Sequence, residues 1–315
     1  MTTRTVGAGH GWKWIVQGVN VGRANPRAVY GATAIVAMLA LLPSIAQAIL
    51  QVSMGFDMRG QLMLAAAMAL ISVPFYALLI GGVLRVIDDV ECGRDARPTD
   101  IFRVFSAAPG GLIAFGLLML LMYVVGAALL GTLFGEGMMT WWVEVMTLSE
   151  AAAQAPVSAP PPVIPEPPSG AGILMFLGVV FGIGCVSIYA IGLGEVALGG
   201  KTPLSAFGEG VRGALRNVLP IAVAATISIA ATVVLALLFV LVAAVLNAIA
   251  SLVHPALSAL LLLPLYLVLL LVVYIVMFGT TYAMWRDVCG PQDDTSTDGP
   301  TPGTGGSGDN SRIEL

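Results

Sequence analysis

The chain has 315 residues, of which 58% are hydrophobic and only 10% are charged. A soluble domain carries about a quarter charged residues, so this composition excludes a soluble globular protein and places most of the chain in lipid. The net charge of −4 and the three cysteines, none in CxxC spacing, give no support for a nucleic-acid partner, a disulfide framework, a cofactor or a metal site.

The N-terminal segment, residues 1–29, is basic and contains no acidic residue. Within it, residues 11–24 carry an apolar stripe at helical spacing, and Trp12 stands beside Lys13. This pattern is typical of an amphipathic helix in the headgroup zone, where an indole ring has one apolar and one wet side. Asn25-Pro26 ends this helix, because the residue before a proline disfavours the helical conformation.

Six apolar runs are long enough to cross a bilayer, which needs about 20 residues. They cover residues 30–50, 62–86, 112–134, 171–198, 218–246 and 256–285. We expect kinks at Pro43, Pro74 and Pro264. Ala46-Gln47-Ala48 resembles a signal-peptidase site, but the preceding basic region is longer than the usual pattern, which favours a retained span.

Two connectors between these spans are also amphipathic. Pro98 begins a short helix over residues 98–107, with Ile101, Phe102 and Phe105 on one side, and Pro109-Gly110-Gly111 interrupts it. The connector over residues 202–216 has Thr202 as N-cap and Pro203 at the first helical position. One stripe of this second connector helix contains Leu204, Phe207, Val211, Leu215 and Val218.

The longest connector, residues 135–170, contains four glutamates and no basic residue. Trp141-Trp142 suit a membrane interface. The second half, residues 151–168, is rich in Ala and Pro, which predicts an extended, semi-rigid linker. The tail, residues 289–315, is rich in Gly, Ser, Thr, Asp and Pro, and we expect it to be disordered and cytoplasmic.

Basic residues orient the spans. An even number of spans places both termini and the two amphipathic connectors on one side, and every Lys and Arg except Arg59 falls on that side. Cytoplasmic connectors are enriched in Lys and Arg. We therefore predict a bacterial inner (cytoplasmic) membrane protein with both termini in the cytoplasm.

The amphipathic helices suggest an internal repeat. Residues 11–24, 98–107 and 202–216 each precede a pair of spans. Asn217 aligns with Asn25, and Pro203 with Pro98. We interpret the chain as three units, each an interfacial helix followed by a transmembrane hairpin. The alternative is that six spans need amphipathic connectors in any case.

Ionisable residues at the membrane edge are the functional candidates. Glu195 lies one turn before the end of the fourth span. It could face the bundle interior and bind a cation or proton, or it could be an interfacial carboxylate paired with Lys201 or Arg212. The third amphipathic helix adds Arg216. Basic residues beside anionic headgroups gain about 1 kcal/mol each, so these helices could bind anionic lipid.

Four short stretches resemble those of an uncharacterised family of six-span bacterial inner-membrane proteins. They are GWKWI at 11–15, GGKTPLSAF at 199–207, RN at 216–217 and YAMWRDV at 282–288. That family is distantly similar to the membrane domain attached to some glycerophosphodiester phosphodiesterases. The resemblance implies an integral membrane protein without an assigned activity, and it supplies no catalytic residues.

The sequence thus predicts an all-α, six-span membrane protein whose transmembrane domain covers residues 30–288. We expect it to be non-enzymatic and to organise lipid or partner proteins. The alternative is a transporter or permease for a lipid-like or weakly polar substrate. The prolines within the spans and the Gly-rich fourth span would suit moving helices, but Glu195 alone is little for ion coupling.

Overall fold

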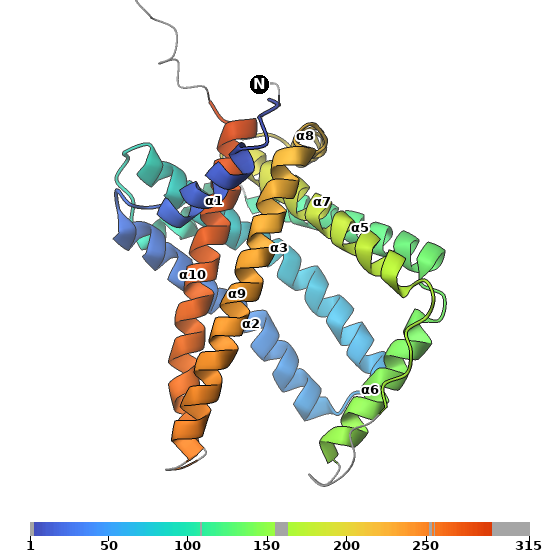
Figure 1. Ribbon diagram of the computed structural model, residues 1–315. Helices are drawn as coiled ribbons and strands as arrows, with labels where there is room; N and C mark the ends of the chain where they lie inside the picture. Colours follow the sequence, from blue (N-terminus) through green and yellow to red (C-terminus); the bar gives the residue numbers. More distant parts are fainter. Residues whose placement is uncertain (1–2, 108, 155–162, 252–253, 255, 292–315) are drawn as a thin grey trace, which may run out of the picture.

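The computed structural model describes residues 3–107, 109–154, 163–251, 254 and 256–291, and every regular element in that part is helical. Figure 1 shows the arrangement. The elements are α1 (His10–Asn20), α2 (Pro26–Met54), α3 (Met58–Glu91), the 3₁₀ helix η1 (Pro98–Arg103), α4 (Val104–Ala107), α5 (Pro109–Phe134), α6 (Met138–Gln154), α7 (Ala171–Ala197), α8 (Pro203–Arg216), α9 (Val218–Ser251) and α10 (Ala256–Val288).

The predicted class is confirmed: six helices in the described part, α2, α3, α5, α7, α9 and α10, are long and apolar enough to cross a membrane. Local signals define their ends. The Asn25 side chain accepts a hydrogen bond from the Ala28 amide at the start of α2, and Asp57 caps α3 through the Gly60 amide. Gly55 ends α2 in the left-handed conformation, with φ 55°.

Several predicted boundaries need correction. The loop expected over 51–61 is only the short turn between Met54 and Met58, because both helices continue past their apolar runs. Pro109 begins α5 instead of interrupting a connector, since proline fits the first turn of a helix. Thr202 occupies the N-cap of α8, but its side chain makes no capping hydrogen bond.

The predicted open connector over 135–170 also contains a helix, α6, which the sequence analysis missed. Its first residues are tied to the Pro-rich stretch, because the Trp141 Nε1 donates to the Pro165 carbonyl at 2.9 Å. Much of the predicted linker (155–162) and of the predicted disordered tail (292–315) lies outside the described residues.

The spans form three hairpins, α2–α3, α5–α7 and α9–α10, and the short helices join them in a cyclic order. The helix α1 packs on α9 and α10, η1 packs on α2 and α3, and α8 packs on α7 and α5. Each short helix therefore lies on the hairpin of the unit before it. The short helix of the first unit, α1, lies on the hairpin of the third unit. This closed arrangement is what a threefold internal repeat predicts.

A glycine lies at each point where a short helix crosses a spanning helix. A Cβ on Gly82 of α3 would lie 2.6 Å from the Ile101 carbonyl oxygen of η1, and one on Gly279 of α10 would lie 2.8 Å from the Gly18 Cα of α1. Gly192 of α7 similarly faces the Ala206 carbonyl of α8, at 3.1 Å from an added Cβ. Small residues at the same place in all three units let backbones approach closely.

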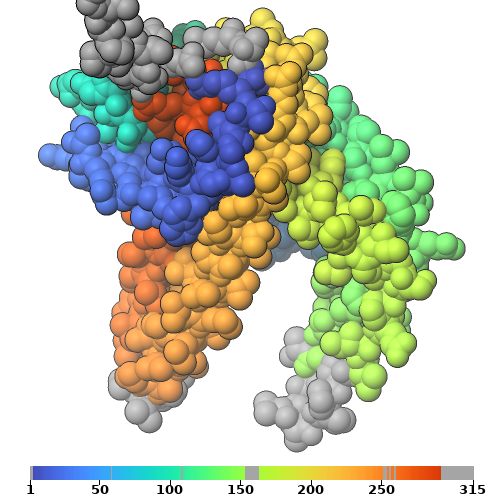
Figure 2. Space-filling model, turned by 45° about the horizontal axis from the view of Figure 1, so that its top comes forward, coloured from blue at the N-terminus to red at the C-terminus, as the bar shows by residue number. Residues whose placement is uncertain are grey.

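The core gathers at one end of the bundle. We call this end the basic pole, defined by α1, η1, α4 and α8, and the opposite end the distal pole (Figure 1). The buried residues of α2 end at Ala37, whereas Leu42 and Ile49 beyond it are exposed. Figure 2 shows the α9–α10 hairpin and the α5–α7 hairpin diverging away from the basic pole. The distal halves therefore present apolar surface that only lipid or another apolar partner can cover.

Candidate functional site

Glu195 is buried at the basic pole, where α7 meets α10. Its side chain is 2% exposed, and its Oε2 lies 2.5 Å from the Lys201 Nζ. The indole Nε1 of Trp285 donates to Oε1 at 3.0 Å. The sequence allowed two interpretations of Glu195: a carboxylate in the bundle interior that binds a cation or proton, or an interfacial carboxylate paired with Lys201 or Arg212. The structure shows the pair with Lys201. The Glu195 side chain is nevertheless buried inside the protein and does not reach water.

The connector after α7 brings Lys201 back to Glu195. Gly200 has φ 65°, a conformation that side chains disfavour, and this turn lets the Lys201 amide donate to the Glu195 carbonyl at 3.1 Å. Burial lowers the pKa of the Lys201 ammonium, but the hydrogen bond and charge of Glu195 outweigh burial and raise that pKa overall. Lys201 therefore stays charged and neutralises the carboxylate.

Trp285 closes the other side of this pair. A Cβ on Gly194 would lie only 2.3 Å from the Trp285 ring, so the indole lies directly on the α7 backbone. Cys289 lies nearby, and its pKa is raised to about 12 by burial first and then by the negative charge of Glu195. The thiol is therefore protonated at neutral pH and is a poor nucleophile.

Arg212 and Arg216, the other two candidates, contact groups other than Glu195. The Arg212 guanidinium contacts Glu209 on its own helix at 3.3 Å, and 56% of its side chain is exposed. Arg216 donates to the Thr3 carbonyl at 3.0 Å and so holds the N-terminal segment. Of the four candidates, the structure therefore pairs Glu195 with Lys201, whereas the two arginines contact other groups.

Two asparagines that align in the predicted internal repeat, Asn25 and Asn217, hold the units together. Asn217 is fully buried, accepts from the Val6 amide at 2.8 Å and donates to the Arg4 carbonyl at 2.9 Å. Asn25 donates to the Ala96 carbonyl at 3.2 Å. In both cases the asparagine binds the segment that precedes the next short helix in the cycle, which is consistent with their predicted alignment.

The end of α3 forms a second polar cluster. Asp88 and Asp89 pair with Arg94, and the Tyr282 hydroxyl of α10 donates to Asp88 at 3.0 Å. Arg85 turns the other way and donates to the Ala197 carbonyl at the end of α7, at 3.0 Å. These groups tie α3 to its neighbours, as expected of a charged membrane edge.

Three exposed basic side chains without an ion pair lie on α1, in the turn after it and at the start of α2. Among the described residues, Lys13, Arg23 and Arg27 are exposed and make no salt bridge. Trp12 beside them is 57% exposed. Trp14, by contrast, is fully buried and donates to Asp287 at 2.8 Å. Thus one indole holds α1 on α10, whereas the other indole is exposed, as are the three cations of α1, the following turn and the start of α2.

The apolar stripe predicted for α8 is largely not its packing face. Leu204 and Leu215 are 73% and 71% exposed, whereas Ala206, Gly210 and Gly213 are buried against the preceding hairpin. The helix therefore packs on protein through small residues and turns its large apolar side chains outward. A helix lying in a membrane interface has this arrangement, with its apolar side chains toward lipid.

The described part of the chain contains no group of three or more His, Cys, Asp or Glu side chains close enough to hold a metal ion. Comparison of the sequence with models of protein families and with curated proteins, and of the fold with solved structures, finds no match. A functional assignment therefore depends on the geometry alone.

Proposed function

We propose that this multi-pass membrane protein organises lipid in a bacterial inner membrane, with its basic pole in the cytoplasm, and that it has no catalytic activity. The observation that carries the proposal is the basic surface formed by α1, the turn after it and the start of α2, where Lys13, Arg23 and Arg27 are exposed. Among the described residues these three cations make no salt bridge, and the ring of Trp12 on α1 is exposed as well. Anionic headgroups and the acyl boundary would complement these two kinds of side chain.

The distal halves of the hairpins support the same proposal. They diverge with exposed apolar side chains (Figure 2), so lipid chains would fill the space between them. The protein would then hold headgroups at its basic pole and acyl chains between its hairpins. The expectation from the sequence that the protein also organises partner proteins stays a prediction.

The ion pair of Glu195 weighs against an ion-coupled transporter. A carboxylate that carries a proton or cation must be free to exchange it, whereas Glu195 is neutralised by Lys201 and held by Trp285. Among the described residues, the remaining charged groups of the spans lie at helix ends. The functional role first considered for Glu195 therefore has little support.

A permease for a lipid-like substrate is the second candidate, and one crevice favours it. Between α7 and α9 lies an apolar crevice of about 350 Å³, lined by Gly182, Val186, Ser228 and Ile229 and closed by Trp14. The outer helix α9 lies largely apart from α7, whereas α5 and α2 pack along the corresponding helices α3 and α10. A lipid could enter the bundle laterally there.

Lipid retention tests the first candidate. In nanodiscs that contain phosphatidylglycerol and phosphatidylcholine, native mass spectrometry would count the anionic lipids kept by the protein. The triple variant Lys13→Gln, Arg23→Gln, Arg27→Gln should lose at least about tenfold in phosphatidylglycerol affinity, since each cation contributes about 1 kcal/mol.

The matched control removes the same charge from the same pole. The variant Arg94→Gln, Arg103→Gln, Arg212→Gln loses three cations, each of which already pairs with an acidic residue. It should retain lipid nearly as the wild type does. Equal loss in both triple variants would show a general charge effect and would refute a lipid site on α1.

Two further measurements separate the candidates and test the orientation. Lipid flux in liposomes would support the permease if it were present in the wild type, and sensitivity to Glu195→Gln would indicate coupling; an organising protein should show no flux. Cysteine probes at Val163 and Ser205, on a variant without native cysteines, should label from outside at 163 only. Outside labelling at 205 would reverse the orientation.

A further inference from the structure

A cavity of about 390 Å³ lies between α2, α3 and α10, within the spans. Its walls are apolar except for Ser44 and three tyrosines, Tyr76, Tyr266 and Tyr274. This size and this mixture, apolar walls with a few polar groups, are typical of a small-molecule site. The site is separate from the surface of α1, and the inference shares with the proposed function only the placement of α1 at the membrane interface.

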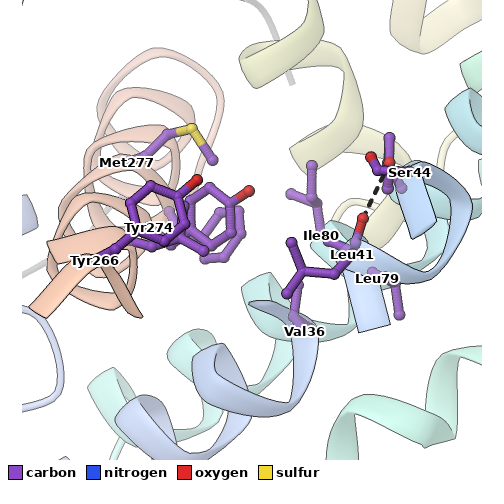
Figure 3. A pocket seen from close by; sticks show the side chains of 12 residues that line it. Val36, Leu41, Ser44, Leu79, Ile80, Tyr266, Tyr274 and Met277 are labelled. Carbon is purple, nitrogen blue, oxygen red and sulfur yellow. Dashed lines mark hydrogen bonds between the residues drawn. The ribbon is translucent and has the colours of Figure 1, made fainter. Parts of the chain in front are cut away.

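Among the described residues, one of the three tyrosine hydroxyls has a hydrogen-bond partner and the other two have none. The Tyr76 hydroxyl donates to the Ala40 carbonyl at 3.2 Å. Tyr266 and Tyr274 line the same cavity, and within the part of the chain that the structure describes their hydroxyls make no hydrogen bond. Figure 3 shows both side chains extending from α10 toward Leu41 and Ile80 on the facing helices.

These hydroxyls lie at hydrocarbon depth. The interfacial helix α1 crosses α10 at Gly279. Tyr274 precedes that crossing by five residues, about 7.5 Å along the helix, and Tyr266 by thirteen, about 20 Å. Water does not reach this depth in a bilayer, and an unpaired hydroxyl there is costly. A ligand that supplies acceptors would remove that cost.

The same depth argues against a glycerolipid as the ligand. Its ester carbonyls lie at the headgroup boundary, beside α1, and they would not reach Tyr266. The acceptor must belong to a molecule whose polar group enters the hydrocarbon. The cavity wall is aromatic, with the Tyr274 and Phe278 rings 5.7 Å apart between centroids, which favours a planar ligand that can stack.

We propose that this cavity binds a lipid-soluble quinone. The two ring carbonyls accept hydrogen bonds from Tyr266 and Tyr274, the ring contacts the aromatic wall, and the isoprenoid chain extends between the diverging hairpins. The proposal concerns binding only and involves no redox step.

Native mass spectrometry of the full chain in phospholipid nanodiscs, titrated with decylubiquinone, tests the proposal. We expect a saturable adduct of one quinone per chain. The double variant Tyr266→Phe, Tyr274→Phe keeps both rings and should weaken binding about 30-fold, since each lost hydrogen bond costs about fivefold to tenfold. Tyr123→Phe, on α5 and outside the cavity, should bind within twofold of the wild type.

Three results would overturn the inference. The first is quinone that only partitions into the nanodisc without saturating. The second is a phospholipid adduct that quinone does not displace, because a glycerolipid would then be the occupant. The third is a double variant that binds as well as the wild type while circular dichroism shows it folded.

Discussion

Replacing Lys201 with methionine should destabilise the protein more than any other single loss of charge at the basic pole. The substitution leaves the Glu195 carboxylate, 2% exposed, without its cation. Trp285 still donates to Oε1, but one neutral donor does not compensate a buried charge. Methionine keeps the length and apolar stem of lysine, so packing changes little.

The size of the effect follows from burial. Removing one partner of a buried ion pair costs about 3–5 kcal/mol. A quarter of the Lys201 side chain is exposed, so solvent screens the pair in part and the lower end, about 3 kcal/mol, applies. Glu195→Gln should cost only about 1 kcal/mol, since glutamine still accepts from Trp285 and Lys201 can turn to solvent.

The assay is reversible unfolding in mixed micelles, with SDS as denaturant and circular dichroism as the readout. The double variant Glu195→Gln, Lys201→Met removes both charges, and it should lose about 1–2 kcal/mol instead of the sum of the single losses. Arg94→Gln is the surface control: 51% of the Arg94 side chain is exposed, and its loss should cost less than about 1 kcal/mol.

Two outcomes would refute this reasoning. If Lys201→Met cost no more than Arg94→Gln, the ion pair would not neutralise a buried charge. If the double variant lost the full sum of the single losses, Glu195 and Lys201 would act independently, and Glu195 would again be a candidate for ion binding.

The remaining predictions concern helix crossing and the cysteines. Gly18→Ala places a Cβ 2.4 Å from the Thr280 Oγ1 and should lower the free energy of unfolding by about 1–3 kcal/mol. Gly178→Ala, whose added Cβ meets nothing within 4 Å, should be neutral or stabilise the protein by up to about 1 kcal/mol. Equal effects of the two variants would contradict the α1–α10 crossing. Because the pKa of the Cys289 thiol is raised in the folded state, the folded protein keeps this proton to higher pH than the unfolded chain does. The melting temperature should therefore fall as the pH rises from about 9 toward 12, and Cys289→Ala should make that fall less steep. An equally steep fall in the variant would show that the thiol does not contribute. Maleimide should label the exposed Cys92 rapidly and the buried Cys185 and Cys289 only after unfolding, and rapid labelling of all three thiols would contradict their burial.

The spans were predictable from the sequence because bilayer thickness and hydropathy determine them almost alone. All six apolar runs are helices, and their ends follow signals such as Asn25-Pro26. The helix α6 was not predicted, because the Ala/Pro-rich stretch dominates the composition of the connector that contains it. Its Trp141-Trp142 pair and run of helix-forming residues were the available signal.

The candidate site was predictable only in part. Proximity in sequence suggested Lys201 as the partner of Glu195, and this is correct. Burial was not evident, because it arises from Trp285, ninety residues away, lying on Gly194. The packing face of α8 was also hidden: hydrophobic periodicity identifies the apolar stripe, which turns outward as expected of an interfacial helix, but it does not reveal the small residues that contact protein.

The cyclic packing gives the Glu195–Lys201 pair a structural meaning. In the cycle, Asn25 holds the segment before η1, and Asn217 holds the segment before α1. The segment before α8 is held by Lys201, whose amide and ammonium both bind Glu195. The ion pair thus holds the third joint from the end of the second span of its unit, whereas the asparagines hold the other two joints from a position directly before the first span of theirs. A joint must stay closed, whereas a carrier must open, so the same geometry that explains the burial of Glu195 also argues that it does not move ions.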